Sequence, residues 1–124
     1  MKQINLTPAE YSLMEIIWDN EGIGSGALVK LALDKLDWKK STTYTILKKL
    51  VEKKTAINKD SVITSKISRE RYSHMQTKGA IKENFSGSLP KFLAAFIREE
   101  KLSDKDIAEL EKIIADYKKE SNKA

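Results

Sequence analysis

Several residue types are scarce in this 124-residue chain, which has no cysteine, one histidine, two prolines and five glycines. Without cysteine the chain forms neither a disulfide framework nor a thiolate metal site, and a cytoplasmic location is expected. The single imidazole, His74, has no paired acidic motif or phosphate loop to accompany it. We therefore expect no enzymatic activity, with no catalytic residues, no cofactor and no metal.

Long apolar runs are also missing. No run approaches the roughly 18 residues of a membrane span, and the N-terminal stretch MKQINLTPAEY lacks the apolar segment of a signal peptide. The scarcity of proline and glycine, together with many leucines and lysines, favours helices throughout. A chain of this length has room for one domain or two small modules.

Positive charge is concentrated in KKSTTYTILKKLVEKK, residues 39–54. Six lysines and Glu52 give this stretch a charge of +5, which equals the formal net charge of the whole chain. The other 108 residues therefore balance to zero. Such a local surplus predicts a surface that binds a polyanion.

Three short helices are expected in the first half. Thr7, Pro8 and Glu10 form a capping box that opens a helix running to about Asn20. The glycines of GIGSG then indicate a plain turn between helices, with Ser25 as the cap of the second helix. The third helix is expected to be capped near Ser41. Three successive helices, the third of them basic, indicate a helix-turn-helix.

Two short runs with strand character follow, 56–58 and 62–64, around a turn at 59–61. They predict a small β-wing, with an irregular loop as the alternative. Ser68, Ser88 and Ser103 then open three further helices. The expected fold class is mainly α with a small β-wing. Residues 1–67 would form a winged helix-turn-helix DNA-binding domain, and residues 68–124 a helical dimerisation domain.

The outer surface of the third helix is the candidate DNA-reading surface. With the apolar residues Ile46, Leu47, Leu50 and Val51 facing inward, hydroxyl groups occupy the outer N-terminal turns and lysines follow. The alternative is an ordinary solvated helix face. The residues expected to contact DNA are Ser41, Thr42, Tyr44, Thr45, Lys48 and Lys49 on the helix, Lys39 and Lys40 before it, and Lys59 in the wing.

The second half carries more apolar residues than three short helices can easily hide, so we expect it to form a homodimer. Folding back onto the first half is the alternative. The residues expected in the dimer interface are Leu89, Phe92, Leu93, Phe96, Ile97, Ile107, Leu110, Ile113, Ile114 and Tyr117.

Three stretches resemble one known family. LTPAEYSLMEIIW, DWKKSTTYTILKKLVEKK and GSLPKFLAAFIREEKLSDKDIAEL are similar, in order, to the start, the recognition helix and the dimerisation segment of the penicillinase repressors. That family includes β-lactam-responsive and copper-responsive repressors of Gram-positive bacteria. The resemblance implies a winged helix, a helical dimerisation half, and repression by a homodimer bound to inverted-repeat operator DNA of β-lactam-resistance type genes.

The chain departs from the family pattern at specific positions. Lys54 stands where the family often has a glycine after the recognition helix, and the wing is shorter than usual. In the β-lactam branch a partner protease cuts an Asn-Phe bond, and the matching candidate cleavage site here is Ala95-Phe96. The absence of cysteine argues against copper sensing.

A second class of function is a basic helical module that binds RNA or an anionic membrane surface. Against a membrane, the apolar sides of the first three helices are needed for a common core. Against RNA, the basic surface lacks interleaved aromatic residues that stack on unpaired bases.

Overall fold

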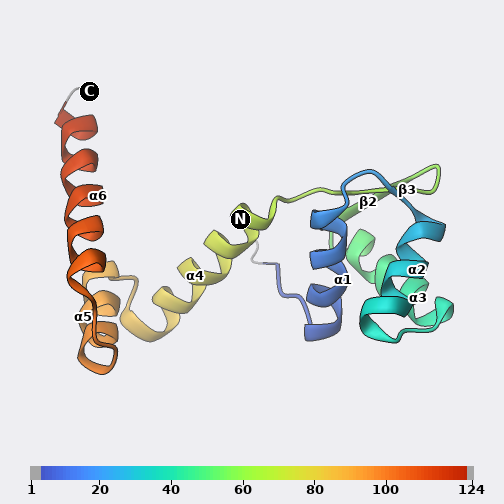
Figure 1. The fold of residues 1–124 in the computed structure, drawn as a ribbon, viewed down its shortest axis with the longest axis horizontal. Helices are drawn as coiled ribbons and strands as arrows, with labels where there is room; N and C mark the ends of the chain where they lie inside the picture. The colour runs from blue at the N-terminus through green and yellow to red at the C-terminus, as the bar shows by residue number, and fades with distance from the viewer. Residues whose placement is uncertain (1–3, 123–124) are drawn as a thin grey trace. The chain divides into compact units, whose positions relative to one another are not determined.

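The computed structural model describes residues 4–122, which form six helices and one three-stranded antiparallel sheet (Figure 1). The chain divides into two compact units between Ala80 and Ile81. The elements are α1 (Pro8–Asp19), β1 (Ile23–Gly24), α2 (Ser25–Leu36), α3 (Lys40–Glu52), β2 (Ala56–Lys59), β3 (Val62–Ser65), α4 (Arg69–Phe85), α5 (Leu89–Glu99) and α6 (Asp104–Asn122).

The capping box at the start of α1 is confirmed. The Thr7 hydroxyl accepts a hydrogen bond from the Glu10 backbone N–H at 3.2 Å, and Glu10 Oε1 accepts one from the Thr7 N–H at 2.8 Å. Pro8 occupies the first helical position, where its missing N–H costs nothing. Because both partners lie within one turn, local sequence was sufficient to predict this helix start.

The predicted starts of α2 and α3 were wrong. Gly24, not Ser25, is the N-cap of α2, and Lys39 rather than Ser41 is the N-cap of α3. Neither helix has a side-chain cap. The Ser25 N–H instead donates to the Ser61 carbonyl at 2.8 Å, so pairing with the wing sets where α2 begins. A tertiary contact has replaced the local cap.

The wing is confirmed as a hairpin, and it gains a strand that the sequence did not predict. Asp60 and Ser61 both have positive φ, 53° and 62°, as a two-residue hairpin turn requires. Lys59 belongs to β2, opposite Val62, and not to the turn as predicted. The GIGSG stretch is not a plain turn either, because Ile23 pairs with Ile63 and the sheet order is β1-β3-β2.

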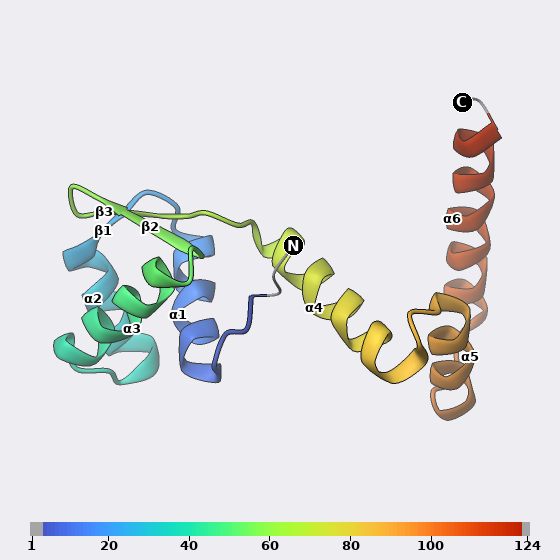
Figure 2. The same cartoon turned by 180° about the vertical axis from the view of Figure 1, so that it is seen from behind.

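One apolar core is formed by residues of α1, α2, α3 and the sheet. Figure 2 shows these elements from behind. Its fully buried large side chains include Leu13, Met14, Ile17, Leu28, Leu50 and Ile63. On α3 the buried residues are Thr43, Leu47 and Leu50. Val51, predicted to face inward, is 38% exposed. A residue after Leu50 is turned by about 100°, which carries Val51 to the edge of the buried stripe.

Side chains of α1 hold the start of α4. The Trp18 indole N–H donates to the Ile67 carbonyl at 2.9 Å. Arg69 lies over the Trp18 ring at 5.4 Å from its centroid and bonds Asp19 at 2.8 Å. Tyr72 is buried against Trp18, with ring centroids 5.8 Å apart. These contacts join the first turns of α4 to the winged-helix core.

The helix starts predicted in the second half are confirmed, since Ser68, Ser88 and Ser103 each accept a backbone N–H three residues on. The expected domain boundary, between residues 67 and 68, falls just before α4 and stays a prediction. The outer ends of those domains, residues 1–3 and 123–124, lie outside the described residues. Over the described chain, no helix is both long and apolar enough to cross a membrane.

Candidate nucleic-acid interface

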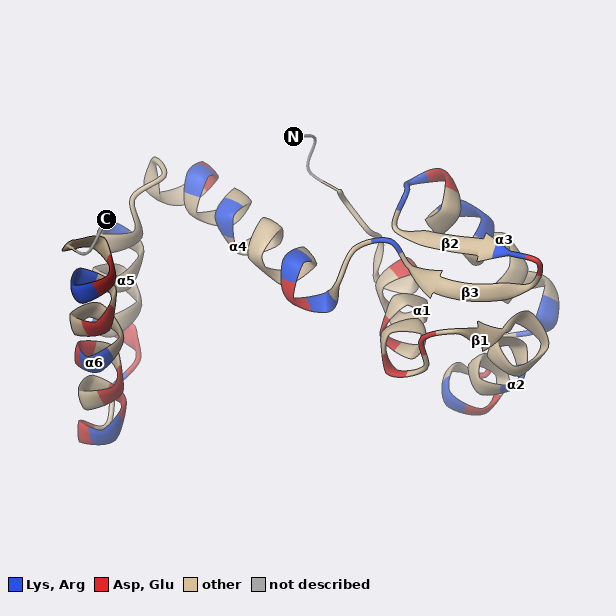
Figure 3. Cartoon of the chain, turned by 90° about the horizontal axis from the view of Figure 1, so that it is seen from above, with Lys and Arg blue, Asp and Glu red and all other residues tan. Residues whose placement is uncertain are grey.

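The outward face of α3 gathers six of the nine predicted DNA contacts. The six residues are all exposed, with hydroxyls in the N-terminal turns and lysines one turn later. Figure 3 colours the lysines of this region blue. Lys39 and Lys40 are exposed at the start of the same helix. Glu52 is the one acid within the 13 residues of α3, and it stands at the far end.

Hydrogen bonds within α3 restrict what its hydroxyls can offer. The Thr45 hydroxyl donates to the Ser41 carbonyl at 2.9 Å. Its only proton is therefore engaged, and the two lone pairs of its oxygen and its methyl group are left for an external ligand. Such an oxygen can accept from the amino group of adenine or cytosine, and the methyl can contact a thymine methyl.

Tyr44 is held from two sides. Its hydroxyl lies 3.4 Å from the Ser25 hydroxyl of α2, and the Lys40 ammonium is 6.0 Å from the centroid of its ring. The side chain is 38% exposed. These contacts fix the ring near the N-terminal turns of α3 while one side of it stays open to a partner.

A groove of about 390 Å³ separates α3 from the wing. It is lined by Tyr44, Leu47, Lys48, Val51 and Asn58. Sequence reasoning missed Val51 and Asn58, because periodicity assigned the first to the core and gave the second no role. Lys59, the predicted contact in the wing, follows Asn58 in β2 and is exposed, but it does not line this groove, because successive side chains of a strand point to opposite faces.

Lys54 follows the C-cap of α3 and takes part in ending the helix. Its φ is 59°, so it adopts the left-handed conformation that glycine takes up most easily. The Thr55 N–H bonds the Leu50 carbonyl at 2.9 Å, and the Lys54 N–H bonds the Val51 carbonyl at 3.0 Å. These two bonds form a Schellman motif, which terminates the helix despite the lysine.

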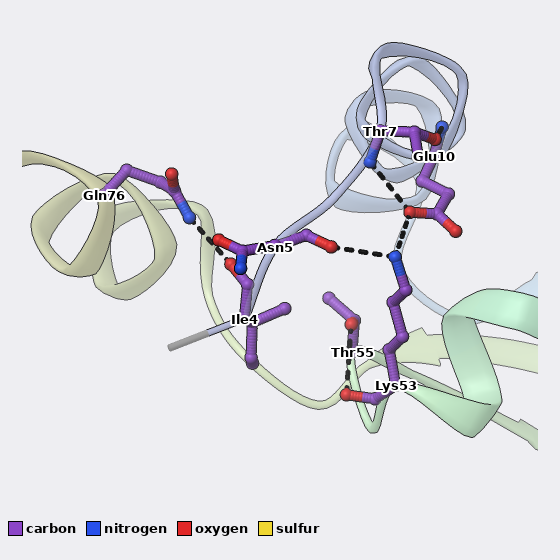
Figure 4. A network of polar contacts seen from close by, with 7 residues as sticks. All are labelled: Ile4, Asn5, Thr7, Glu10, Lys53, Thr55 and Gln76. Atoms are coloured by element: carbon purple, nitrogen blue, oxygen red, sulfur yellow. Dashed lines mark hydrogen bonds and ion pairs between the residues drawn. The ribbon is translucent and has the colours of Figure 1, made fainter. Parts of the chain in front are cut away.

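Lys53 has a role that the sequence did not reveal. Its ammonium lies 2.6 Å from Oε1 of Glu10, a residue that is 1% exposed (Figure 4). Burial acts to raise the pKa of Glu10, but the hydrogen bonds from Lys53 and Thr7 outweigh it, and the pKa is lowered from its ordinary value of 4.5. The partners are 43 residues apart, so no local motif could have paired them.

The predicted dimer residues lie on α5 and α6, and most of them are exposed in the single chain. Phe92, Leu93 and Leu110 are half-buried. The exposed ones are Leu89, Phe96, Ile97, Ile107, Ile113, Ile114 and Tyr117. Ala95 and Phe96, the candidate cleavage site, lie within α5. Within residues 4–122, no cluster of three or more His, Cys, Asp or Glu side chains forms that could hold a metal ion.

Known proteins provide the comparison. The sequence model of the penicillinase repressor family matches residues 6–116. A penicillinase repressor of Bacillus licheniformis is 27% identical over 124 residues, covering 95% of this chain and 96% of that protein. One from Staphylococcus aureus is 23% identical, covering 95% and 97%. A multiple antibiotic-resistance repressor (MarR) structure from Listeria monocytogenes has a TM-score of 0.47 and 13% identity, covering 96% of this chain and 77% of that one. Since the family match spans nearly the whole winged helix and the helices after it, the chain belongs to the penicillinase repressor family of transcriptional repressors.

Proposed function

We propose that this chain represses transcription by binding specific sequences in double-stranded DNA, with α3 as the recognition helix. The observation that carries the proposal is the outward face of α3. Its N-terminal turns present hydroxyls at Thr42, Tyr44 and Thr45, and Lys48 and Lys49 follow one turn later. A recognition helix meets base edges with its N-terminal residues, whereas lysines attract phosphates.

The wing supports the same function. Lys59 is exposed on β2, the strand whose Asn58 lines the groove together with residues of α3. In this arrangement α3 enters the major groove while Lys59 contacts a neighbouring phosphate. With Lys39 and Lys40 at the start of the helix, Lys59 extends the basic surface beyond α3 itself.

The repressor acts as a homodimer on inverted repeats. Seven large apolar side chains of α5 and α6 are more than 40% exposed, an arrangement that a monomer rarely tolerates. A second copy of the same surface would cover them, because a two-fold interface pairs like with like. Such a dimer presents two α3 helices related by a two-fold axis.

Binding is tested by selecting duplexes from a random library and measuring their affinity by fluorescence anisotropy. The proposal expects one selected operator to bind at least about a thousandfold more tightly than random duplex. Inserting about five base pairs between its half-sites should abolish tight binding, because one site then faces the other side of the helix. Tighter binding to single-stranded RNA or to anionic vesicles, measured in parallel, would favour the alternative basic module.

The remaining part of the proposal concerns control. We propose that the repressor acts in the cytoplasm on genes of β-lactam-resistance type, and that a signalling protease ends repression by cleaving it. The candidate bond, Ala95-Phe96, lies within α5, and Phe96 is 48% exposed. A protease needs an extended substrate, so cleavage requires this helix to unwind locally. Mass spectrometry of the chain from cells grown with and without a β-lactam tests it, and an intact chain in both cultures contradicts cleavage.

A further inference from the structure

The segment Ile4–Thr7 is anchored on two sides by side chains distant in sequence (Figure 4). On one side the Lys53 ammonium donates to the Asn5 carbonyl at 2.8 Å. On the other side the Gln76 side-chain amide of α4 donates to the Ile4 carbonyl at 2.7 Å. The segment therefore connects the C-terminal end of α3 with α4.

The charge of Lys53 is already compensated within the protein. Its ammonium contacts the Glu10 carboxylate at 2.6 Å, and the Thr7 N–H bonds the same carboxylate oxygen at 2.8 Å. Glu10 is almost fully buried and has no access to other cations in bulk solvent. Moving the ammonium to a DNA phosphate would leave this buried carboxylate without its counter-charge, which is costly.

Lys53 is also the C-cap of α3, and its backbone N–H bonds the Lys49 carbonyl at 2.9 Å. Its side chain thus acts directly on the end of the helix. A helix of 13 residues is about 20 Å long, so a small tilt at one end shifts the other end by an ångström or more. Base contacts tolerate about 0.5 Å of displacement, whereas flexible lysines adapt to phosphates.

We propose that Lys53 is a positioning residue and not a phosphate contact. Together with Glu10, the Ile4–Thr7 segment and Gln76, it fixes the angle at which α3 presents its outer face. The inference rests on the proposed DNA-binding function. It assigns one lysine of the basic stretch 39–54 to holding the recognition helix, and it gives Gln76, on another helix, a share in operator recognition.

The test compares Lys53→Met and Gln76→Leu with Lys48→Met, all in the full-length chain. Affinity for the selected operator and for a random duplex is measured over a range of salt concentrations. We expect Lys53→Met and Gln76→Leu to weaken operator binding about tenfold and random-duplex binding less than twofold, with an unchanged salt slope. Lys48→Met should lower that slope by about one. Lys53→Arg, which keeps the charge and the donors, should retain operator preference.

Three results would overturn the inference. A salt slope lowered by about one in Lys53→Met identifies a phosphate contact. Undiminished operator preference in folded Lys53→Met or in Gln76→Leu shows that the network positions nothing. A wild-type chain that shows no operator preference contradicts the proposed function itself. This result differs from the first two, which contradict only the positioning role of Lys53. Circular dichroism checks folding, and if Lys53→Met is unfolded, Gln76→Leu decides, because its side chain lies outside the core.

Discussion

Lys53 and Glu10 form an ion pair at 2.6 Å between the end of α3 and the start of α1. One partner is 38% exposed at its side chain and the other 2%. The pair is therefore open to solvent on the lysine side, and its carboxylate depends on that single lysine and on the Thr7 N–H for compensation. Removing the lysine should therefore lower the free energy of unfolding by an amount that depends on pH.

The first prediction concerns Lys53→Met. In the wild type the pKa of Glu10 is below 4.5, so its ionised form contributes stability that is present above about pH 4.5 and is lost as pH falls through the folded value. Without Lys53, burial dominates and the pKa of Glu10 rises. The variant should be less stable by about 1 to 3 kcal/mol at pH 7, and the gap should narrow toward pH 3. Urea unfolding at several pH values measures it, and a gap independent of pH would contradict this account.

The second prediction separates lysines from hydroxyls on α3. Replacing Lys49 with alanine should weaken operator and random-duplex binding about equally and lower the salt slope by about one, as expected for a phosphate contact. Replacing Thr42 with alanine should cost about 1 to 3 kcal/mol on the operator and leave nonspecific binding unchanged. Anisotropy titrations on both duplexes measure these effects. Equal losses on both duplexes for Thr42→Ala would show that it reads no base.

The third prediction uses the hydrogen bond from the Thr45 hydroxyl to the Ser41 carbonyl. Because the hydroxyl proton is engaged, Thr45 offers an acceptor oxygen and a methyl group. Thr45→Val replaces the hydroxyl with a methyl group, and Thr45→Ser keeps the hydroxyl and removes the methyl. We expect at least one of the two to change which base is preferred at a single operator position, measured by repeating the duplex selection. If both variants select the same operator sequence as the wild type, Thr45 does not contact a base.

The fourth prediction concerns the exposed apolar surface of α5 and α6. Ile113 is 63% exposed, so Ile113→Glu should leave the chain folded while placing a charge in the proposed interface. Multi-angle light scattering should then give a monomer mass where the wild type gives a dimer. The matched control is Lys105→Glu, an exposed position on the same helix, which should remain dimeric. A monomeric wild type at micromolar concentration rules out the homodimer.

The fifth prediction concerns Lys54, which holds φ at 59° after α3. Glycine adopts this conformation without the steric cost that a side chain brings, so Lys54→Gly should raise stability by about 0.5 to 1 kcal/mol. Lys54→Ala keeps the cost and should give no such gain. Thermal unfolding of the two variants in parallel provides the comparison, and equal melting temperatures would show that the conformation is not strained.

The sequence alone determined the features that depend on neighbours within one turn. The capping box of Thr7 and Glu10 and the serine caps at Ser88 and Ser103 involve partners three residues apart. The hairpin was also predicted from its strand-forming runs, although its turn is Asp60-Ser61 and not the predicted 59–61. Helical periodicity predicted the exposed side of α3, since each residue's direction follows from the pitch of the helix. The fold class followed from these local signals, and the family resemblance from three matching stretches of sequence.

Tertiary structure decided what depends on residues distant in the chain. Ser25 is of a residue type that often caps helices, yet Gly24 is the N-cap of α2, and the Ser25 N–H bonds the Ser61 carbonyl, 36 residues on. Lys53 lies in the basic stretch 39–54, as a phosphate contact would, yet its ammonium is paired with the Glu10 carboxylate. In both cases the residue contacts a partner that is distant in sequence. That contact contributes to the free energy of folding only when the chain folds and brings the two residues together, so the sequence around either residue does not reveal it.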